Sequence, residues 1–158
     1  MEDSQRRIGW SEWSIIVSES ESIVLEAFAA VDSRDAERLK RISHPEASFV
    51  WPESLQPSNF RTVQGKVATS WEEVWEPFQP LPEFTTRKMN PQIVASSGKL
   101  VTVLWHQRGV NRRGERLDCE VLGLYEVRDG LLYRAQMFYF DTAAVRKFLQ
   151  SNDIKSFE

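Results

Sequence analysis

The chain has little cysteine and histidine, two side chains that enzymes often use for chemistry. Its 158 residues contain one cysteine, Cys119, and two histidines, His44 and His106. A single cysteine excludes a disulfide within the chain and fits a reducing compartment, so we expect a cytoplasmic protein. One thiol and one well-placed imidazole are too few for a zinc site, so we expect no metal and no cofactor.

Features that direct proteins to membranes or nucleic acids are also missing. No run of 18 apolar residues is present, so we expect no membrane-spanning helix. The stretch MEDSQRRIGWSEWSIIVSESES is acidic and broken by polar residues, which does not fit a signal peptide. The net charge of −3 provides no basic surface, so we expect no nucleic-acid partner.

Aromatic residues, by contrast, are frequent. The chain has six tryptophans and nine phenylalanines. For any single ring, packing in the core is the more common role. Several of these rings nevertheless recur at positions that could line one internal cavity.

The order of the expected elements points to one α+β domain. Helical periodicity begins at Ser18, continues at 36–42 and returns at 71–78, where Trp71, Val74, Trp75 and Phe78 form an apolar stripe. A short strand at 47–51 lies between these helices, strands dominate from Glu83 to Phe140, and a final helix follows Asp141. We expect helices packed over one face of an antiparallel sheet. The expected units are an extension (1–17, with Trp10 and Trp13), one domain (18–150) and a tail (151–158).

The hairpin turns predict the register of the sheet. Asp129-Gly130 is a two-residue turn signal, which places Gly123 opposite Gln136 and Val121 opposite Phe138. If Arg113-Gly114 is the preceding tip, His106 lies opposite Val121; a loop two residues longer places it opposite Cys119. A β-bulge would reverse the faces.

This register divides the strands into two faces, both substantially apolar. One face carries Thr102, Leu104, His106, Cys119, Val121, Gln136, Phe138 and Phe140. The other carries Val103, Trp105, Asp118, Glu120, Leu122, Leu124, Met137 and Tyr139. We expect helices to cover the first face and a second copy of the chain to cover the other, giving a homodimer.

Residues from Ser20 to Leu149 resemble the nuclear transport factor 2-like superfamily. The segments SIVLEAFAAVDSRDAERL and VLGLYEVRDGLLYRAQMFYFD carry the resemblance. The superfamily includes ketosteroid isomerases, SnoaL-like polyketide cyclases and limonene epoxide hydrolases. The resemblance implies a cone-shaped curved sheet, a deep apolar pocket under the helices, and a dimer through the opposite sheet face.

The catalytic residues of these relatives do not carry over. The general base of the isomerases falls near Trp51, and their two oxyanion-stabilising groups fall near Ala27 and Leu122. The arginine and aspartates of the epoxide hydrolases fall at Leu104, His106 and Phe138, and their water-positioning residues at Phe49 and Trp51. Only His106 is ionisable at a position where the family does chemistry.

We therefore expect His106 to transfer protons and Gln136 to orient the substrate. The alternative is a core histidine with a satisfied hydrogen bond. A Cys119–His106 nucleophilic pair is less expected than a buried thiol. The ligand-binding set is expected to comprise Phe28, Phe49, Trp51, Trp75, Leu104, Cys119, Val121, Phe138 and Phe140.

Three functions stay open on these residues. The first is a cofactor-independent isomerisation, cyclisation or dehydration of an apolar polycyclic or polyketide-like substrate. The second is a ligand-binding or assembly module without turnover, and the third is an epoxide hydrolase with rearranged acid–base groups. Outside this site we expect His44 at the surface, Asp141 as a helix cap, and an exposed hairpin formed by Arg108, Arg112, Arg113 and Arg116.

Overall fold

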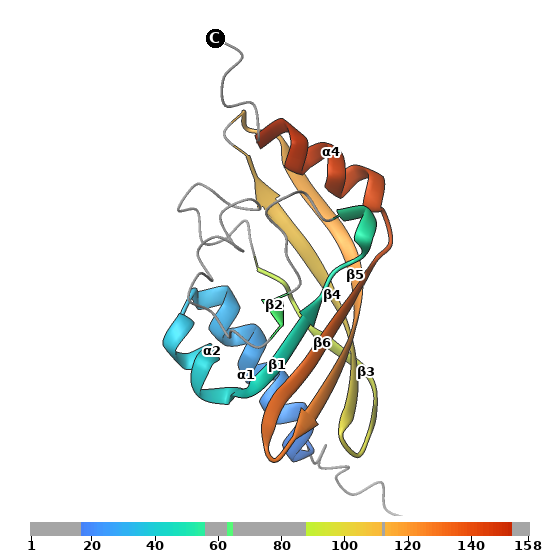
Figure 1. Ribbon diagram of the computed structural model, residues 1–158. Coiled ribbons are helices and arrows are strands. Elements are labelled where there is room, and N and C mark those ends of the chain that lie inside the picture. Colours follow the sequence, from blue (N-terminus) through green and yellow to red (C-terminus); the bar gives the residue numbers. More distant parts are fainter. Residues whose placement is uncertain (1–16, 56–62, 65–87, 112, 153–158) are drawn as a thin grey trace, which may run out of the picture.

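The computed structural model describes residues 17–55, 63–64, 88–111 and 113–152 (Figure 1). The helices there are α1 (Glu19–Ser33), α2 (Ala36–Ile42), the short 3-10 helix η1 (Glu53–Leu55) and α4 (Thr142–Asn152). The strands are β1 (Ser43–Val50), β2 (Val63–Gln64), β3 (Gln92–Ser97), β4 (Leu100–Val110), β5 (Arg116–Arg128) and β6 (Leu131–Tyr139). The expected helix at 71–78 and the extension with Trp10 and Trp13 lie outside these residues.

Local sequence chemistry places the helices as expected. Ser18 and Glu21 form a reciprocal capping box at the start of α1, which satisfies two backbone N–H groups that lack partners in the helix. Asp35 caps α2 by accepting a hydrogen bond from the Arg38 N–H. Asp141 accepts a hydrogen bond from the Ala144 N–H and so caps α4, as predicted. None of the described helices is long and apolar enough to cross a membrane.

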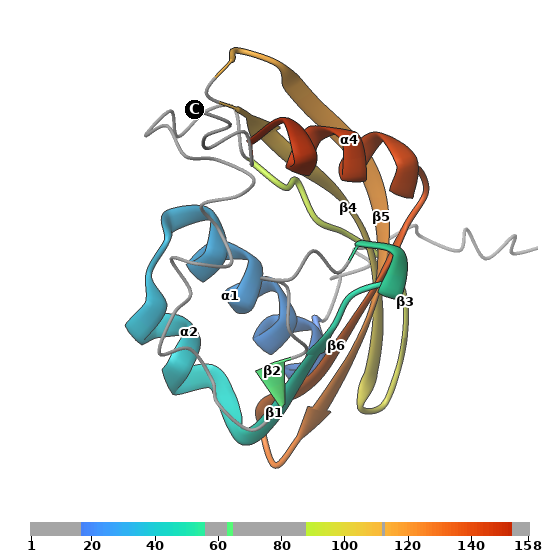
Figure 2. The same cartoon turned by 45° about the horizontal axis from the view of Figure 1, so that its top comes forward.

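The sheet has the strand order β2-β1-β6-β5-β4-β3. Its neighbours pair antiparallel except β1 and β6, which run parallel. Figure 2 shows α1 and α2 on one side of the strongly bent sheet. The expected α+β class, with helices over one face of a curved sheet, is confirmed, although β1 makes the sheet mixed.

The predicted register of β6 against β5 is wrong by one residue. Arg128 pairs with Leu131 at the turn as expected, but a shift between Glu126 and Val127 leaves Tyr133 without a partner. Beyond this bulge Val121 pairs with Tyr139 and not with Phe138. One extra residue reverses every later side chain of β6, because side chains alternate between faces with period two.

The predicted register of β4 against β5 is wrong for a different reason. Val110 pairs with Arg116, so the loop contains the five residues 111–115, an odd number. Both alternatives in the prediction assumed a loop with an even number of residues. His106 therefore pairs with Glu120, and Trp105 pairs with Val121.

These two shifts exchange the faces of β4 and β6 relative to β5. The face under α1, called the interior face below, carries Val101, Val103, Trp105, Cys119, Val121, Tyr125, Ala135, Met137 and Tyr139, all buried. The opposite, outer face carries Leu104, His106, Asp118, Glu120, Leu122, Leu124, Gln136 and Phe138. The expected outer residues Val103, Trp105, Met137 and Tyr139 thus belong to the core.

Candidate functional site

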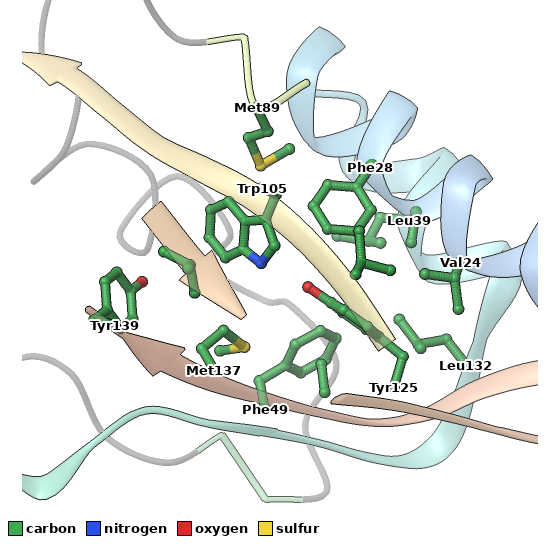
Figure 3. Close-up of a cluster of buried hydrophobic side chains, with 14 of the residues drawn as sticks. Val24, Phe28, Leu39, Phe49, Met89, Trp105, Tyr125, Leu132, Met137 and Tyr139 are labelled. Carbon is green, nitrogen blue, oxygen red and sulfur yellow. The ribbon is translucent and has the colours of Figure 1, made fainter. Parts of the chain in front are cut away.

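Aromatic side chains from three parts of the chain meet between α1 and the interior face (Figure 3). Phe28 of α1 contacts Trp105 edge-on, with ring centroids 5.7 Å apart, and Tyr125 in the same manner at 5.4 Å. Trp105 also contacts Tyr139 edge-on at 6.3 Å. Edge-to-face contacts fix ring orientation as well as burying apolar area, so these groups hold one another in defined directions.

The position of the Tyr125 ring requires the glycine two residues before it, Gly123. Both residues point to the interior face, and the Tyr125 ring lies over Gly123, which has no side chain. A Cβ built on Gly123 would lie 2.4 Å from Cε2 of Tyr125 and 2.5 Å from its hydroxyl oxygen. Burial raises the pKa of the Tyr125 hydroxyl far above its usual value; nearby Tyr139 adds to this and Trp105 opposes it. The group is therefore a neutral phenol at any physiological pH.

Tyr139 belongs to a short polar chain on the same face. Its hydroxyl donates to Oε1 of Gln107 over 3.2 Å. Burial raises the pKa of the Tyr139 hydroxyl as well, against a hydrogen bond with the Trp51 side chain that lowers it. Gln107 points inward because it lies two residues after Trp105 on β4.

Among the buried side chains that the structure describes, the Trp105 indole carries the one polar group without a hydrogen-bond partner. Its Nε1 atom is buried and has no hydrogen-bond partner in the described part of the chain. Figure 3 shows this nitrogen facing the Tyr125 hydroxyl, without the geometry of a regular hydrogen bond. Since buried N–H groups are rarely left unpaired, this one needs an explanation.

The interior has polar groups but few charges. Within the described ranges, the buried polar or charged residues apart from tyrosines are Ser43 and Asn111, and no acidic or basic side chain is buried. No group of three or more histidine, cysteine or acidic residues could hold a metal ion in that part of the chain. The described groups of the interior can donate hydrogen bonds to a ligand in an apolar setting.

The predicted interior position of His106 is wrong. Its Nδ1 lies 2.6 Å from Oδ1 of Asp118 on the outer face, and Arg108 Nε donates to the other Asp118 oxygen over 3.0 Å. Burial raises the pKa of Asp118, but the hydrogen bonds from His106 and Arg108 outweigh it and lower the pKa overall. His106 is thus part of a surface polar network, away from α1.

The other predicted site residues divide between the two faces. Phe28, Phe49, Cys119 and Val121 are buried in the core, and Trp51 packs against it. Leu104, Gln136 and Phe138 lie on the outer face, where Phe138 is 46% exposed and Gln136 accepts from Arg134. Phe140, at 63%, is more exposed still. Trp75 lies outside the described residues.

Cys119 and His106 cannot form a nucleophilic pair, because they occupy opposite faces of the sheet. The Cys119 thiol lies near the carbonyl oxygens of Glu120 and Asp141. Burial raises the pKa of this thiol, so it stays protonated and behaves as a small apolar side chain.

Sequence reasoning missed the polar groups that do face the interior: Trp105, Gln107, Tyr125 and Tyr139. Two of them, Trp105 and Tyr139, were predicted on the dimer face by the wrong register. One local signal pointed to Tyr125. A glycine two residues before an aromatic residue on a strand leaves room on the same face for the ring to fold back.

Comparisons with known proteins agree with this fold. A family model described as a SnoaL-like domain matches residues 24–135. The structure of TerC co-crystallised with polyporic acid superposes with a TM-score of 0.70 at 20% identity, covering 84% of this chain and 99% of TerC. IdmH of Streptomyces antibioticus, a candidate polyketide cyclase, gives 0.63 at 19% identity over 84% and 99%. A candidate SnoaL-like polyketide cyclase from Jannaschia sp. CCS1 gives 0.63 at 18% identity over 85% and 96%. No curated protein matches.

Proposed function

The chain belongs to the SnoaL-like domain family, and from this we propose that it binds a small apolar, polycyclic or polyketide-like molecule between α1 and the interior face. The reaction is a cofactor-independent cyclisation, isomerisation or dehydration. The observation that carries the proposal is the set of neutral, oriented polar groups among buried aromatic rings, namely Trp105, Tyr125 and the Gln107–Tyr139 pair.

These groups suit a substrate that supplies its own acidic proton. A CH₂ group between two carbonyls loses a proton more readily when one carbonyl oxygen accepts hydrogen bonds, since the developing charge moves to that oxygen. That proton moves to the polarised carbonyl oxygen, which gives the enol, and the enol carbon then attacks a second carbonyl of the same molecule. A C–C bond forms, the new alkoxide takes up the proton that carbon lost, and no oxidant or reductant is needed.

The structural neighbours support a ligand of this kind. TerC was crystallised with polyporic acid, and two other neighbours are candidate polyketide cyclases. Because each is 20% identical or less, the likeness by itself supports the fold, and the chemistry rests on the interior groups of this chain.

Binding of polyporic acid, followed by calorimetry, tests the ligand site. We expect Gln107→Leu to weaken binding about tenfold, the effect of losing one buried hydrogen-bonding group. His106→Gln is the matched control, because the neighbouring residue points to the outer face, and it should bind as the unchanged protein does. Equal losses in both variants, or binding abolished only by outer-face changes, would contradict an interior site.

A non-catalytic ligand-binding module is the second candidate, and one observation favours it. No acidic or basic side chain is buried in the described ranges, so these residues provide no buried general base. Exchange of an acidic ligand C–H for deuterium in D₂O separates the two functions: acceleration by the protein supports turnover, and unchanged exchange of a bound ligand supports a binder.

An epoxide hydrolase has less support, since Leu104, His106 and Phe138, which align with its catalytic groups, lie on the outer face.

We also propose a homodimer through the outer face of the sheet. The residues of its interface differ from those expected from the sequence, because the register of β4 and β6 is different. Leu104 pairs with Leu122, and Leu122 with Phe138, so these side chains form an apolar row across three strands. Leu124 and Phe138 are more than a third exposed, which is unusual for a cluster on a monomer. Polar pairs lie beyond one end of the row, first His106 with Glu120 and then Arg108 with Asp118, as at the rim of an interface.

Sedimentation of the full chain at micromolar concentration tests the dimer. We expect the unchanged protein to sediment as a dimer and Phe138→Asp as a monomer that still binds polyporic acid. A monomeric unchanged protein would overturn this proposal and leave the ligand site unaffected.

The lone cysteine, which is buried and free, fits a cytoplasmic location, which fractionation of cells producing the protein would test.

A further inference from the structure

We infer that Trp105 and Tyr125 together form a carbonyl-binding point, and that the ligand places an uncharged oxygen acceptor between the indole N–H and the phenol O–H. This inference rests on the proposed ligand site and specifies what it selects. Trp105 and Tyr125 are thereby the specificity-determining residues, and both are buried, at 6% exposure each.

The direction of the indole N–H is fixed by its neighbours. Phe28 meets the Trp105 ring edge-on at an interplanar angle of 67°, and Tyr139 does so at 70°. The ring is therefore held from the α1 side and from the β6 side. Its Nε1 atom faces the Tyr125 hydroxyl, where the two polar atoms converge (Figure 3).

The unpaired state of Nε1 indicates a missing acceptor. An indole N–H can only donate, and a buried donor without an acceptor is unfavourable and uncommon in native proteins. The Tyr125 hydroxyl faces the nitrogen, and its interaction with Trp105 lowers the pKa of the phenol, but the contact does not have the geometry of a hydrogen bond. A ligand oxygen that accepts from both groups would satisfy them at once.

The surroundings select a neutral acceptor over an anion. No arginine or lysine is buried in the described ranges, so a carboxylate or phosphate oxygen would meet no compensating charge. A ketone or quinone carbonyl needs only hydrogen bonds. The rings of Phe28, Trp105 and Tyr125 around the point favour a flat, apolar body attached to that carbonyl.

The test uses two probes that differ in one carbonyl, 9-fluorenone and fluorene. The dissociation constants of both probes are measured by calorimetry on the full chain. For each variant we take the ratio of the fluorene constant to the fluorenone constant and compare it with the ratio for the unchanged protein. The difference in hydrophobicity between the two probes is the same in every variant, so it cancels in this comparison. We expect Tyr125→Phe and Trp105→Phe each to reduce the preference for fluorenone by about tenfold, with fluorene binding little changed. His106→Gln on the outer face should leave the ratio unchanged.

A spectroscopic measurement does not depend on either variant folding. In ¹H–¹⁵N spectra of the unchanged protein, the Trp105 indole resonance, assigned through its contacts with Phe28, should move downfield with fluorenone and not with fluorene. If both probes bind inside but neither the ratio nor this resonance responds, the carbonyl-binding point is overturned while the ligand site stands. If neither probe binds, the proposed ligand site fails and this inference fails with it.

Discussion

Trp105 and His106 are adjacent in sequence and belong to opposite sides of one sheet. Trp105 is buried among aromatic rings, and its ring N–H has no partner in the described part of the chain. The His106 side chain is 31% exposed, and its ring nitrogen is paired with the Asp118 carboxylate. Position on the sheet therefore decides the environment of each side chain: the imidazole of His106 is on the partly exposed outer face, and the less reactive indole of Trp105 faces the interior.

The two faces also differ in how they treat charge. On the outer face, Asp118 is paired with His106 and Arg108, and all three side chains are partly exposed. On the interior face, burial keeps the Tyr125 and Tyr139 phenols protonated. The described interior polar groups are thus neutral, whereas the outer face carries ion pairs.

The largest expected difference in stability is between deleting an aromatic ring in the interior and deleting one on the outer face. Phe28→Ala removes a ring that contacts Trp105 and Tyr125, and should lower the free energy of unfolding by about 3–5 kcal/mol. Phe138→Ala on the outer face should cost the monomer less than about 1 kcal/mol. Urea titrations at low protein concentration measure both. Similar losses would show that the two faces are equally packed.

A smaller effect is expected where the interior is crowded. In Gly123→Ala the new methyl group would collide with the Tyr125 ring, so we expect a loss of about 1–3 kcal/mol in the free energy of unfolding. The double variant Gly123→Ala with Tyr125→Ala is the control, because it removes the ring that is struck. The two losses should then be less than additive in a double-mutant cycle; additive losses would contradict the contact.

The next largest loss of stability is expected from a substitution in the loop at 111–115, which connects β4 and β5. Asn111 is fully buried, accepts hydrogen bonds from the Arg113 and Glu115 N–H groups, and donates to Glu115 and to Ser151 of α4. Asn111→Ala should lower the free energy of unfolding by about 1–2 kcal/mol. Hydrogen exchange should show the loss of protection first at the 113 and 115 amides. Unchanged protection there would argue against Asn111 as the loop's anchor.

The smallest effect is the pH response of the outer network. Because the folded-state pKa of Asp118 is lowered, its contribution to stability is present above its unfolded pKa and is lost as pH falls through the lowered value. His106→Gln removes one of the hydrogen bonds that lower it, so the pKa of Asp118 should rise towards its usual value. Carboxyl ¹³C titration by NMR measures this. An unchanged titration would show that Arg108 alone holds the carboxylate.

Local features of this fold could be predicted because local chemistry sets them. The capping box of Ser18 and Glu21 works through groups three residues apart. The Asp129-Gly130 turn has both residues at positive φ, 53° and 72°, as a two-residue hairpin turn requires. The alternation within β5 correctly placed Cys119 and Val121 together, because a strand's own period does not depend on its neighbours.

The candidate site was misplaced because it depends on how strands meet. The bulge leaves Tyr133 unpaired, where the Arg128 guanidinium lies 3.4 Å from its ring centroid and His44 of β1 contacts it edge-on. His44 is far away in sequence, so the contact exists only after β1 has joined the sheet. At the other hairpin, Asn111 begins the loop at 111–115 and donates a hydrogen bond to Ser151 of α4, which is also distant in sequence.

The sequence by itself therefore determined the helices that the structure describes, the hairpin turn at Asp129-Gly130 and the fold class, since these follow from local chemistry and from the order of elements along the chain. Only the tertiary structure decided which residues of β4 and β6 face that interior. The physical reason is the two-residue period of a strand, by which a single unpaired residue exchanges its two faces. That exchange replaced His106 and Gln136 with Trp105, Gln107 and Tyr139 as the interior groups.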